Sequence, residues 1–355
     1  MSNVPINKGN YGLETPEREA LFERYRGEGW EEGYAAYRRN WHELPQRQEV
    51  SEYPLLVDLE LSTACNLKCP MCYTVTEEFK QKIPARMMDF TLFTKVIDEI
   101  GGRVPALRLS LRGEPTIHPR FIDCIAYAKA HGIGEVSFLT NCSTLTPEFF
   151  TRAMEAGADW ITISVDGLDG MYESIRKPLK FQETLDKIKA MKEIKERAGR
   201  HRPVIKVQAI WPSIKDDPQA FYDTFAPYAD LIAFNPLIDY LGKDSEIVYE
   251  EGFICCQQYQ RLVVGADGRV MICSNDEETS VCVGDAATET IREIWHGGKL
   301  QHYRDLHRQP DGFKQVELCR GCYLPRKTET AEEARINGVS VAVNNYVNRS
   351  QTIGS

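Results

Sequence analysis

Three cysteines in the first third of the chain have the spacing of a metal-binding loop. Cys65, Cys69 and Cys72 form a C-x3-C-x2-C pattern directly after an apolar segment with the pattern of a strand. Thiolates are soft donors that suit iron–sulfur clusters. Three of them on one tight loop can hold three irons of a [4Fe–4S] cluster and leave the fourth iron open to an external ligand. A zinc site is the alternative, although structural zinc sites close with four ligands in a different spacing.

A second set of cysteines lies in the C-terminal part of the chain. Cys255, Cys273, Cys319 and Cys322 form a C-x17-C-x45-C-x2-C pattern. Four thiolates can close a cluster fully, and a zinc site with four cysteines is the alternative. Cys256 directly follows Cys255, so the spacing alone leaves open which of the two is a ligand. A closed cluster has no open iron for a substrate, and its expected use is to carry electrons.

The bulk composition predicts a globular protein with a small-molecule partner. The 355 residues are too many for one small core and predict a large domain with a smaller one. The net charge of −9 and the pI near 5.5 argue against binding nucleic acid through a basic surface. They suit a small polar partner instead.

Cellular location is inferred from what the sequence lacks. It contains no apolar run near the roughly 20 residues that cross a bilayer, and its N-terminal segment has no apolar signal region. We therefore expect a cytoplasmic protein that makes no membrane contact. In a reducing compartment the 11 cysteines are expected to be metal ligands or reactive thiols rather than disulfides.

The elements that must position these residues alternate between strands and helices. Strand patterns cover residues 55–61, 106–111, 135–140, 160–166, 204–210 and 231–236. Helical patterns cover residues 90–100, 119–130, 147–156, 181–196 and 220–228. This alternation implies right-handed βαβ units and a parallel sheet. We predict an α/β fold, a partial (β/α)6 TIM-like barrel, with the ligand at the carboxyl ends of the strands.

Four regions are expected along the chain. Residues 1–50 form an N-terminal helical extension, in which Thr15-Pro16 has the chemistry of a helix start. Residues 51–240 form the barrel. Residues 241–330 form a small α+β domain, with a hairpin that turns at Asp267-Gly268 and a short helix over residues 290–295. Residues 331–355 are expected to be a polar C-terminal tail.

The first cysteine motif resembles a known family. The segment CNLKCPMCY resembles the signature of the radical S-adenosylmethionine (SAM) superfamily, and the likeness extends over about residues 55–325. The resemblance implies that the open iron chelates SAM, whose reductive cleavage gives a 5′-deoxyadenosyl radical that abstracts hydrogen. Residues 255–322 resemble the auxiliary-cluster domain of the SPASM/twitch branch. With no cysteine after Cys322, the region is twitch-like, and two [4Fe–4S] clusters and SAM are the implied cofactors.

The same resemblance implies a set of cofactor-binding residues. Arg112-Gly113-Glu114-Pro115 resembles the GGEP motif that contacts the SAM amino group, with Arg112 in place of the first glycine. The branch's usual spacing to an aromatic residue favours Cys255 over Cys256 as the cluster ligand. Arg176 matches an arginine that pairs with the SAM carboxylate, a surface ion pair being the alternative. The other implied SAM contacts are Tyr73, Ser164, Asp166 and Gln208.

Candidate catalytic groups follow from the expected chemistry. A free thiol could return a hydrogen atom to a substrate radical, and Cys142, Cys256 and Cys282 are the candidates. The alternative for each is a packed small apolar residue. Asp239, followed by Tyr240, comes just after the sixth strand and could act as a base. Capping of the strand end is the alternative for that pair.

Three functions compete at this point. The first is hydrogen abstraction from a small polar substrate, sugar-like or aminocyclitol-like, by a dehydrogenase or an epimerase. The second is a maturase that modifies a peptide. The third is a non-enzymatic iron–sulfur electron carrier, against which the three-cysteine open site argues. The resemblance implies flavodoxin or ferredoxin as the electron donor, and no nucleic-acid partner is expected.

Overall fold

One curved sheet organises the molecule. The computed structural model describes residues 4–5, 11–236 and 246–348 of the chain. Ten strands are hydrogen-bonded in the order β1-β7-β6-β5-β4-β3-β2-β8-β9-β10. These strands are β1 (Tyr11–Gly12), β2 (Leu56–Leu59), β3 (Ala106–Arg108), β4 (Glu135–Thr140), β5 (Trp160–Ser164), β6 (Val204–Ile210), β7 (Leu231–Asn235), β8 (Arg261–Val264), β9 (Arg269–Met271) and β10 (Cys282–Asp285).

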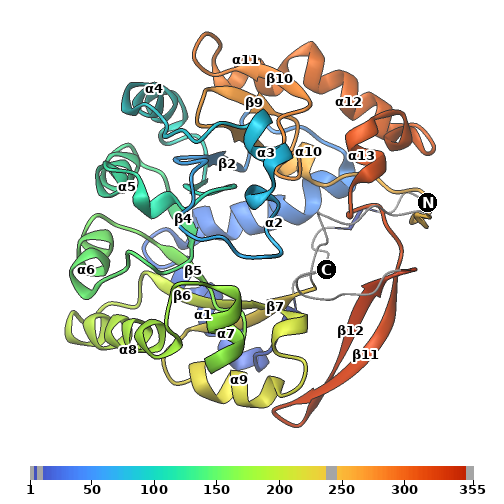
Figure 1. Ribbon diagram of the computed structural model, residues 1–355. Helices are drawn as coiled ribbons and strands as arrows, with labels where there is room; N and C mark the ends of the chain where they lie inside the picture. The colour runs from blue at the N-terminus through green and yellow to red at the C-terminus, as the bar shows by residue number, and fades with distance from the viewer. Residues whose placement is uncertain (1–3, 6–10, 237–245, 349–355) are drawn as a thin grey trace.

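The predicted parallel barrel is confirmed. Strands β2 to β7 pair in parallel in chain order, and β1 adds to β7 in the antiparallel sense. Figure 1 shows α4, α5, α6 and α8 along the outer side of this arc. The barrel helices are α3 (Glu77–Lys82), α4 (Phe90–Ile100), α5 (Phe121–Ala130), α6 (Pro147–Glu155), α7 (Asp169–Ile175), α8 (Phe181–Arg197) and α9 (Pro218–Phe225). Their bounds agree with the predicted ones to within a few residues wherever a helix was expected.

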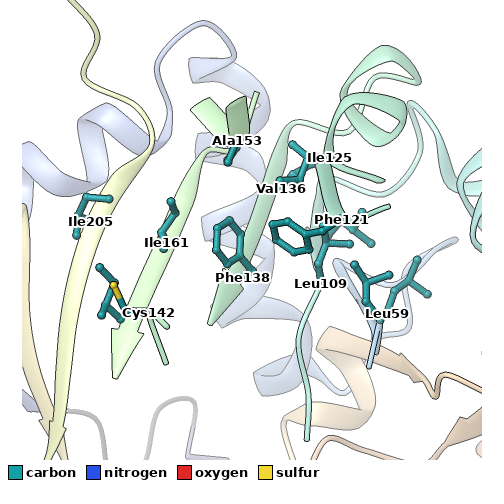
Figure 2. Close-up of a cluster of buried hydrophobic side chains, with 14 of the residues drawn as sticks. Leu59, Leu109, Phe121, Ile125, Val136, Phe138, Cys142, Ala153, Ile161 and Ile205 are labelled. Carbon is teal, nitrogen blue, oxygen red and sulfur yellow. The ribbon is translucent and has the colours of Figure 1, made fainter. Parts of the chain in front are cut away.

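The two faces of the barrel strands differ in polarity. Alternate residues such as Leu59, Leu109, Val136 and Ile161 are buried against the outer helices (Figure 2). Successive side chains of a strand point to opposite faces. The intervening positions therefore face the barrel interior. Besides apolar residues such as Leu56, Leu139 and Trp160, they include Asp58, Glu60, Arg108, Ser110, Ser137, Thr162, Ser164, Lys206 and Gln208. Barrel interiors are usually filled by branched apolar side chains, so a polar interior indicates a space for a ligand.

The N-terminal extension packs against this barrel. It consists of α1 (Pro16–Arg26), capped by the Thr15 hydroxyl as predicted, and α2 (Glu31–Arg47). Arg26 ends α1 and forms a buried ion pair with Glu135 of β4, with Nε and Oε2 2.9 Å apart. A Cβ atom on Gly134 would lie 2.6 Å from the Trp30 ring, so the chain approaches this indole closely. The extension is therefore part of the barrel's wall.

The C-terminal region continues the same sheet. Strand β8 pairs in parallel with β2, opposite its β3 edge, and β9 and β10 follow in the antiparallel sense. The predicted hairpin turn is present, and Gly268 there has a φ of +91°. The helices are α10 (Gln257–Gln260), α11 (Ile291–His296), α12 (Gly298–Arg308) and α13 (Glu317–Gly321), and Thr290 and Glu293 form a capping box on α11. None of the described helices combines the length and apolarity needed to cross a bilayer.

The segment that was expected to be a tail is folded as far as residue 348. Strands β11 (Thr328–Ile336) and β12 (Val339–Tyr346) form an antiparallel hairpin, which Figure 1 shows beside α9 and α13. Glu332 accepts a hydrogen bond from the Trp211 indole at 3.0 Å, and the Asn337 amide donates to Gln219 at 2.8 Å. The prediction of a tail is therefore wrong for residues 331–348. Asn337 and Gly338, both with positive φ, form the turn.

Candidate active site

The first three cysteines share one loop at the carboxyl end of β2. The Cys72 amide donates to the Cys69 carbonyl at 3.0 Å, and η1 (Tyr73–Val75) follows directly. Cys69 is buried and Cys65 is exposed. Burial, opposed by Arg176, raises the pKa of the Cys69 thiol to about 11, with smaller contributions from Asp166, Cys72 and Cys65. Because neighbouring thiols contribute to the raised pKa values of Cys65 and Cys69, a bound cation would favour the ionised form of these two side chains.

The Arg112–Pro115 motif lies directly against this loop. A Cβ atom on Gly113 would stand 2.3 Å from the Ala64 carbonyl oxygen, so only glycine fits there. The Glu114 amide donates to the same carbonyl at 2.9 Å. The buried Glu114 carboxylate accepts bonds from the Asn141 amide at 2.7 Å and from the Thr140 hydroxyl at 2.8 Å. Glu114, which is predicted to contact an amino group, thus lies beside the cysteine loop, at the ends of β3 and β4.

The other predicted SAM contacts lie on β5, on β6 and in the segment after β5, except Tyr73, which is in η1. Ser164 at the end of β5 is the register partner of Gln208 on β6. Asp166 accepts a bond from the Ile210 amide at 3.1 Å and is 2.5 Å from Arg176 Nη2. Although burial opposes it, Asp166 and Cys69 raise the pKa of Arg176. Arg176 is therefore held in the barrel by Asp166 and is not a surface ion pair.

Arg112 departs from the GGEP pattern and has partners of its own. Its Nε donates to the fully buried Glu60 carboxylate at 2.6 Å, and Nη2 contacts the same carboxylate. Its Nη1 donates to the Glu277 carbonyl and to the Thr279 hydroxyl, both at 3.0 Å. Arg112 thus joins the first cysteine site to the loop that follows Cys273. Sequence reasoning did not find this contact, because the loop is far away in the chain.

The second cysteine set comes together from three segments. Cys255 belongs to an apolar cluster with Phe253, Phe313 and Leu324, against which Cys319 and Cys322 pack. Burial raises the pKa of Cys255 well above its usual value, and Cys256, Cys319 and Cys322 add to it. The pKa of Cys273 is raised in the same way by burial and by Cys255 and Cys322. The donor set fits a cationic cluster, which would relieve this mutual repulsion.

Two observations bear on the metal and the ligand choice. Among the described residues, no three metal-ligating side chains stand where a single ion could bind all of them. Each thiolate of a [4Fe–4S] cluster binds a different iron, so such a cluster does not need three side chains that converge on one ion. Cys256 packs in a separate cluster with Ile254 and Tyr259. The structure therefore packs Cys255 with Cys319 and Cys322, and Cys256 in a neighbouring apolar cluster.

A cavity of about 460 Å³ lies in the barrel interior. Its wall includes Lys206 and Gln208 of β6, together with aromatic residues of α1 and α2. Cys256, Ser274 and Tyr323 of the C-terminal region line it as well. One cavity is therefore bounded both by the barrel and by the region that carries the second cysteine set.

The candidate catalytic thiols are in different surroundings. Cys142 is fully buried in the core outside the sheet (Figure 2), where burial raises its pKa to about 12. Its φ of +67° lies in the left-handed region that favours glycine. Cys282 is exposed, and its thiol donates to the Gly284 carbonyl. Of the three candidates, Cys256 lines the cavity, whereas Cys142 and Cys282 do not. Asp239 and Tyr240 lie outside the described residues.

Sequence reasoning missed the charged residues of the cavity. Asp58, Arg108 and Arg261 come from three adjacent strands, and the cavity wall includes both arginines. The signal that could have found Asp58 and Arg108 was the alternation of polar and apolar residues in the strands. Asp58, Arg108 and Lys206 are all at alternate positions of otherwise apolar segments.

The fold and the two cysteine sites together define an iron–sulfur enzyme of the partial-barrel class. The family model of the radical SAM superfamily matches residues 59–205, and that of the SPASM iron–sulfur cluster-binding domain matches residues 255–323. The chain belongs to the radical SAM superfamily, in its SPASM branch. Its cofactors are SAM and [4Fe–4S] clusters, and the electron-carrier alternative is set aside.

Characterised relatives match the chain over part of their length. A tungsten-containing aldehyde ferredoxin oxidoreductase cofactor-modifying protein from Pyrococcus furiosus is 31% identical over 156 residues, which are 43% of this chain and 42% of the relative. Mycofactocin maturase MftC from Mycobacterium tuberculosis is 29% identical over 144 residues, 40% of this chain and 34% of the relative. The chain thus matches less than half the length of these proteins.

Solved structures share the fold at low sequence identity. Streptococcus suis SuiB bound to S-adenosylmethionine superposes with a TM-score of 0.58 at 12% identity, over 82% of this chain and 77% of SuiB. BtrN in complex with AdoMet and 2-DOIA gives a TM-score of 0.51 at 15% identity, over 76% of this chain and 92% of BtrN. At these identities the likeness establishes the shared architecture.

Proposed function

We propose that the chain is a radical SAM maturase, which abstracts a hydrogen atom from a peptide residue seated in the barrel cavity. The observation that carries the proposal is the shared wall of the cavity: Gln208 lies at its SAM end, and Cys256 and Tyr323 come from the auxiliary region. When bound, SAM and its cluster supply the 5′-deoxyadenosyl radical, and an auxiliary cluster supplies an electron acceptor. The chain's own task is to hold the substrate between the two sites and to exclude water.

Named residues divide this task. Cys65, Cys69 and Cys72 would hold the first cluster, and Cys255, Cys273, Cys319 and Cys322 the auxiliary one. Glu114, fixed by the Asn141 amide and the Thr140 hydroxyl, would accept the SAM amino group. Arg176, held by Asp166, would face the SAM carboxylate. Tyr73, Ser164 and Gln208 would complete the SAM contacts.

The choice of a maturase rests on the sequence relatives. Mycofactocin maturase, heme synthase and a cofactor-modifying protein match the chain at 27–31% identity. These names support a maturase more than the sugar-like or aminocyclitol-like substrate that was expected first. A dehydrogenase or epimerase of a small polar molecule is the second candidate. The cavity volume favours it, since pockets of about 300–1,000 Å³ are typical of small-molecule sites.

Anaerobic turnover tests the reaction class. Reconstituted protein with SAM and dithionite should release 5′-deoxyadenosine, and Cys65→Ala, Cys69→Ala and Cys72→Ala should each abolish this release. Cys124→Ala is the matched control, because Cys124 is fully buried in the barrel core and far from either cysteine loop in sequence. Release that persists in all three loop variants would contradict the proposal.

Substrate panels test the substrate class. Short peptides encoded beside the gene should stimulate 5′-deoxyadenosine release and change in mass, whereas sugars and aminocyclitols should not. Cys319→Ala and Cys322→Ala should still form 5′-deoxyadenosine. They should not form the oxidised peptide, which lacks two hydrogens, because the auxiliary cluster can no longer accept the electron. Stimulation by a sugar or aminocyclitol alone would replace the first candidate with the second. In that case, deuterium from solvent in the sugar or aminocyclitol product would indicate epimerisation.

A further inference from the structure

A charged group in the barrel interior has no part in the chemistry described so far. Arg108 of β3 and Arg261 of β8 both line the cavity and both approach Asp58 of β2. Arg108 Nε lies 2.8 Å from one carboxylate oxygen and Arg261 Nη1 lies 3.3 Å from the other. The Asp58 side chain is completely buried, while those of Arg108 and Arg261 are 32% and 14% exposed. The cations, and not the carboxylate, are accessible.

Around Arg108 and Arg261, the positive charge of the cavity wall exceeds the negative charge. Asp58 is the one carboxylate paired with either arginine in the described part of the chain. Lys206 of β6 lines the same cavity. The acids nearby are already balanced, because Glu135 pairs with Arg26 and Glu23 pairs with both Arg26 and Arg38. The cavity therefore has at least one guanidinium charge that no described carboxylate balances.

Hydrogen-bond donors are also in excess. Three donors of cavity-lining residues, Arg108 Nε, Arg261 Nε and the Trp160 indole nitrogen, are buried without a hydrogen-bond partner. Among the described residues, the one acceptor in the same condition beside them is Oδ1 of Asp58. Buried donors in native proteins nearly always have acceptors. Burial and Arg261 lower the pKa of Arg108, in spite of Asp58 beside it. Geometry and electrostatics agree that an acceptor-rich, negatively charged group would satisfy this end of the cavity.

We propose that Arg108 and Arg261 form a binding site for a carboxylate or phosphate group of the substrate. Guanidinium groups match both anions in a bidentate manner. Arg108 comes two residues before Ser110, and Lys206 two residues before Gln208, which is about 7 Å along a strand. The anion would thus lie below the SAM end of the cavity, and the reacting part of the substrate above it. That the occupant is the substrate rests on the proposed function.

A purely structural role for the three residues predicts a different outcome. If Asp58 serves only to join β2, β3 and β8, its replacement changes stability and leaves anion binding unaffected. If Asp58 competes with the ligand for the two arginines, Asp58→Asn strengthens anion binding. The sign of this effect separates the two roles and does not depend on a loss of function.

The binding experiment uses the full chain with its clusters, under anaerobic conditions and without reductant. Quenching of Trp41 and Trp160, which both line the cavity, reports binding. Succinate is the carboxylate probe, inorganic pyrophosphate the phosphate probe and succinamide the neutral control. We expect one of the two anions to bind in the millimolar range. Arg108→Gln and Arg261→Gln should each weaken binding about 10-fold, a loss of 1.4 kcal/mol, and Asp58→Asn should strengthen it.

The outcomes are distinct. Arg24→Gln, on the exposed side of α1, is the matched control and should bind like the wild type. Preference for succinate would identify a carboxylate site, and preference for pyrophosphate a phosphate site. Equal binding of succinamide, or binding unchanged in both arginine variants, would overturn the inference. Because no turnover is needed, anion binding without 5′-deoxyadenosine release would uphold this site and reject the proposed function.

Discussion

Lys206 places an amine in the barrel interior, where a positive charge is costly. Burial and the nearby Arg26 lower its pKa from 10.5 to about 7. Between these two values the unfolded chain binds the proton and the folded chain does not, so rising pH stabilises the fold. Each unit of pKa difference is worth about 1.4 kcal/mol. The wild type should therefore gain stability relative to Lys206→Met as the pH rises from 7 to 10.

Thermal unfolding of the cluster-loaded protein checks this. The difference in Tm between wild type and Lys206→Met should move in favour of the wild type between pH 7 and pH 9.5. Glu23, His42, Glu135 and Arg108 line the same cavity and are unchanged in both proteins. Lys180→Met, at an exposed position, is the control and should show no such trend. A pH-independent difference for Lys206→Met would contradict the lowered pKa.

The three candidate thiols make a matched set of single-residue tests. Cys256 lines the cavity, so Cys256→Ala should abolish any hydrogen return to the substrate, seen as loss of solvent deuterium from the product. Cys142→Ala should cost about 1 kcal/mol of stability and leave the product unchanged, because its thiol is in the core. Cys282→Ala should change neither. Normal deuterium incorporation in Cys256→Ala would exclude Cys256 as the donor.

At the scale of elements, α1 is fixed to the barrel by a buried ion pair. The side chains of Arg26 and Glu135 are only 4% and 2% exposed. Removing one partner leaves an uncompensated buried charge, which costs about 3–5 kcal/mol. Arg26→Ala should therefore lower the Tm strongly, whereas Arg24→Ala on the same helix should not. Arg26→Met combined with Glu135→Gln should recover most of the loss, and equal losses in the single and double variants would argue against an ion-pair origin.

The elements differ in how far the sequence could predict them. The alternation of strand and helix patterns correctly predicted the barrel strands and helices, because both periodicities are local features of the sequence. The β11–β12 hairpin was missed, although Asn337-Gly338 between alternating apolar residues is a strong turn signal. The direct pairing of β8 with β2 had no local signal at all, since it joins segments about 200 residues apart. The same holds for the cavity, whose charged residues Arg108 and Arg261 meet only through that pairing.

At the scale of the whole molecule, one arginine connects the two cysteine sites. Arg112 binds Glu60 on the barrel side and the Glu277 carbonyl and Thr279 hydroxyl on the auxiliary side. The family commonly has glycine here, so this chain has exchanged a flexible residue for a bridge. Arg112→Gly should free the loop after Cys273, which hydrogen exchange of residues 274–279 would detect as faster exchange. The spectral lines of the auxiliary cluster should also broaden, because a mobile loop exposes the cluster to a wider range of surroundings.

The variant also leaves Glu60 buried without its partner, and this second effect has to be separated from the first. Adding Glu60→Gln to Arg112→Gly should restore part of the lost stability, because it removes the uncompensated charge. It should not restore slow exchange in residues 274–279, because the bonds to Glu277 and Thr279 are still missing. Arg269→Ala, a partly exposed position in the adjacent hairpin, controls for general loosening. If the double variant regains both properties, Arg112 acts only by neutralising Glu60, and the two cysteine sites are not coupled through it.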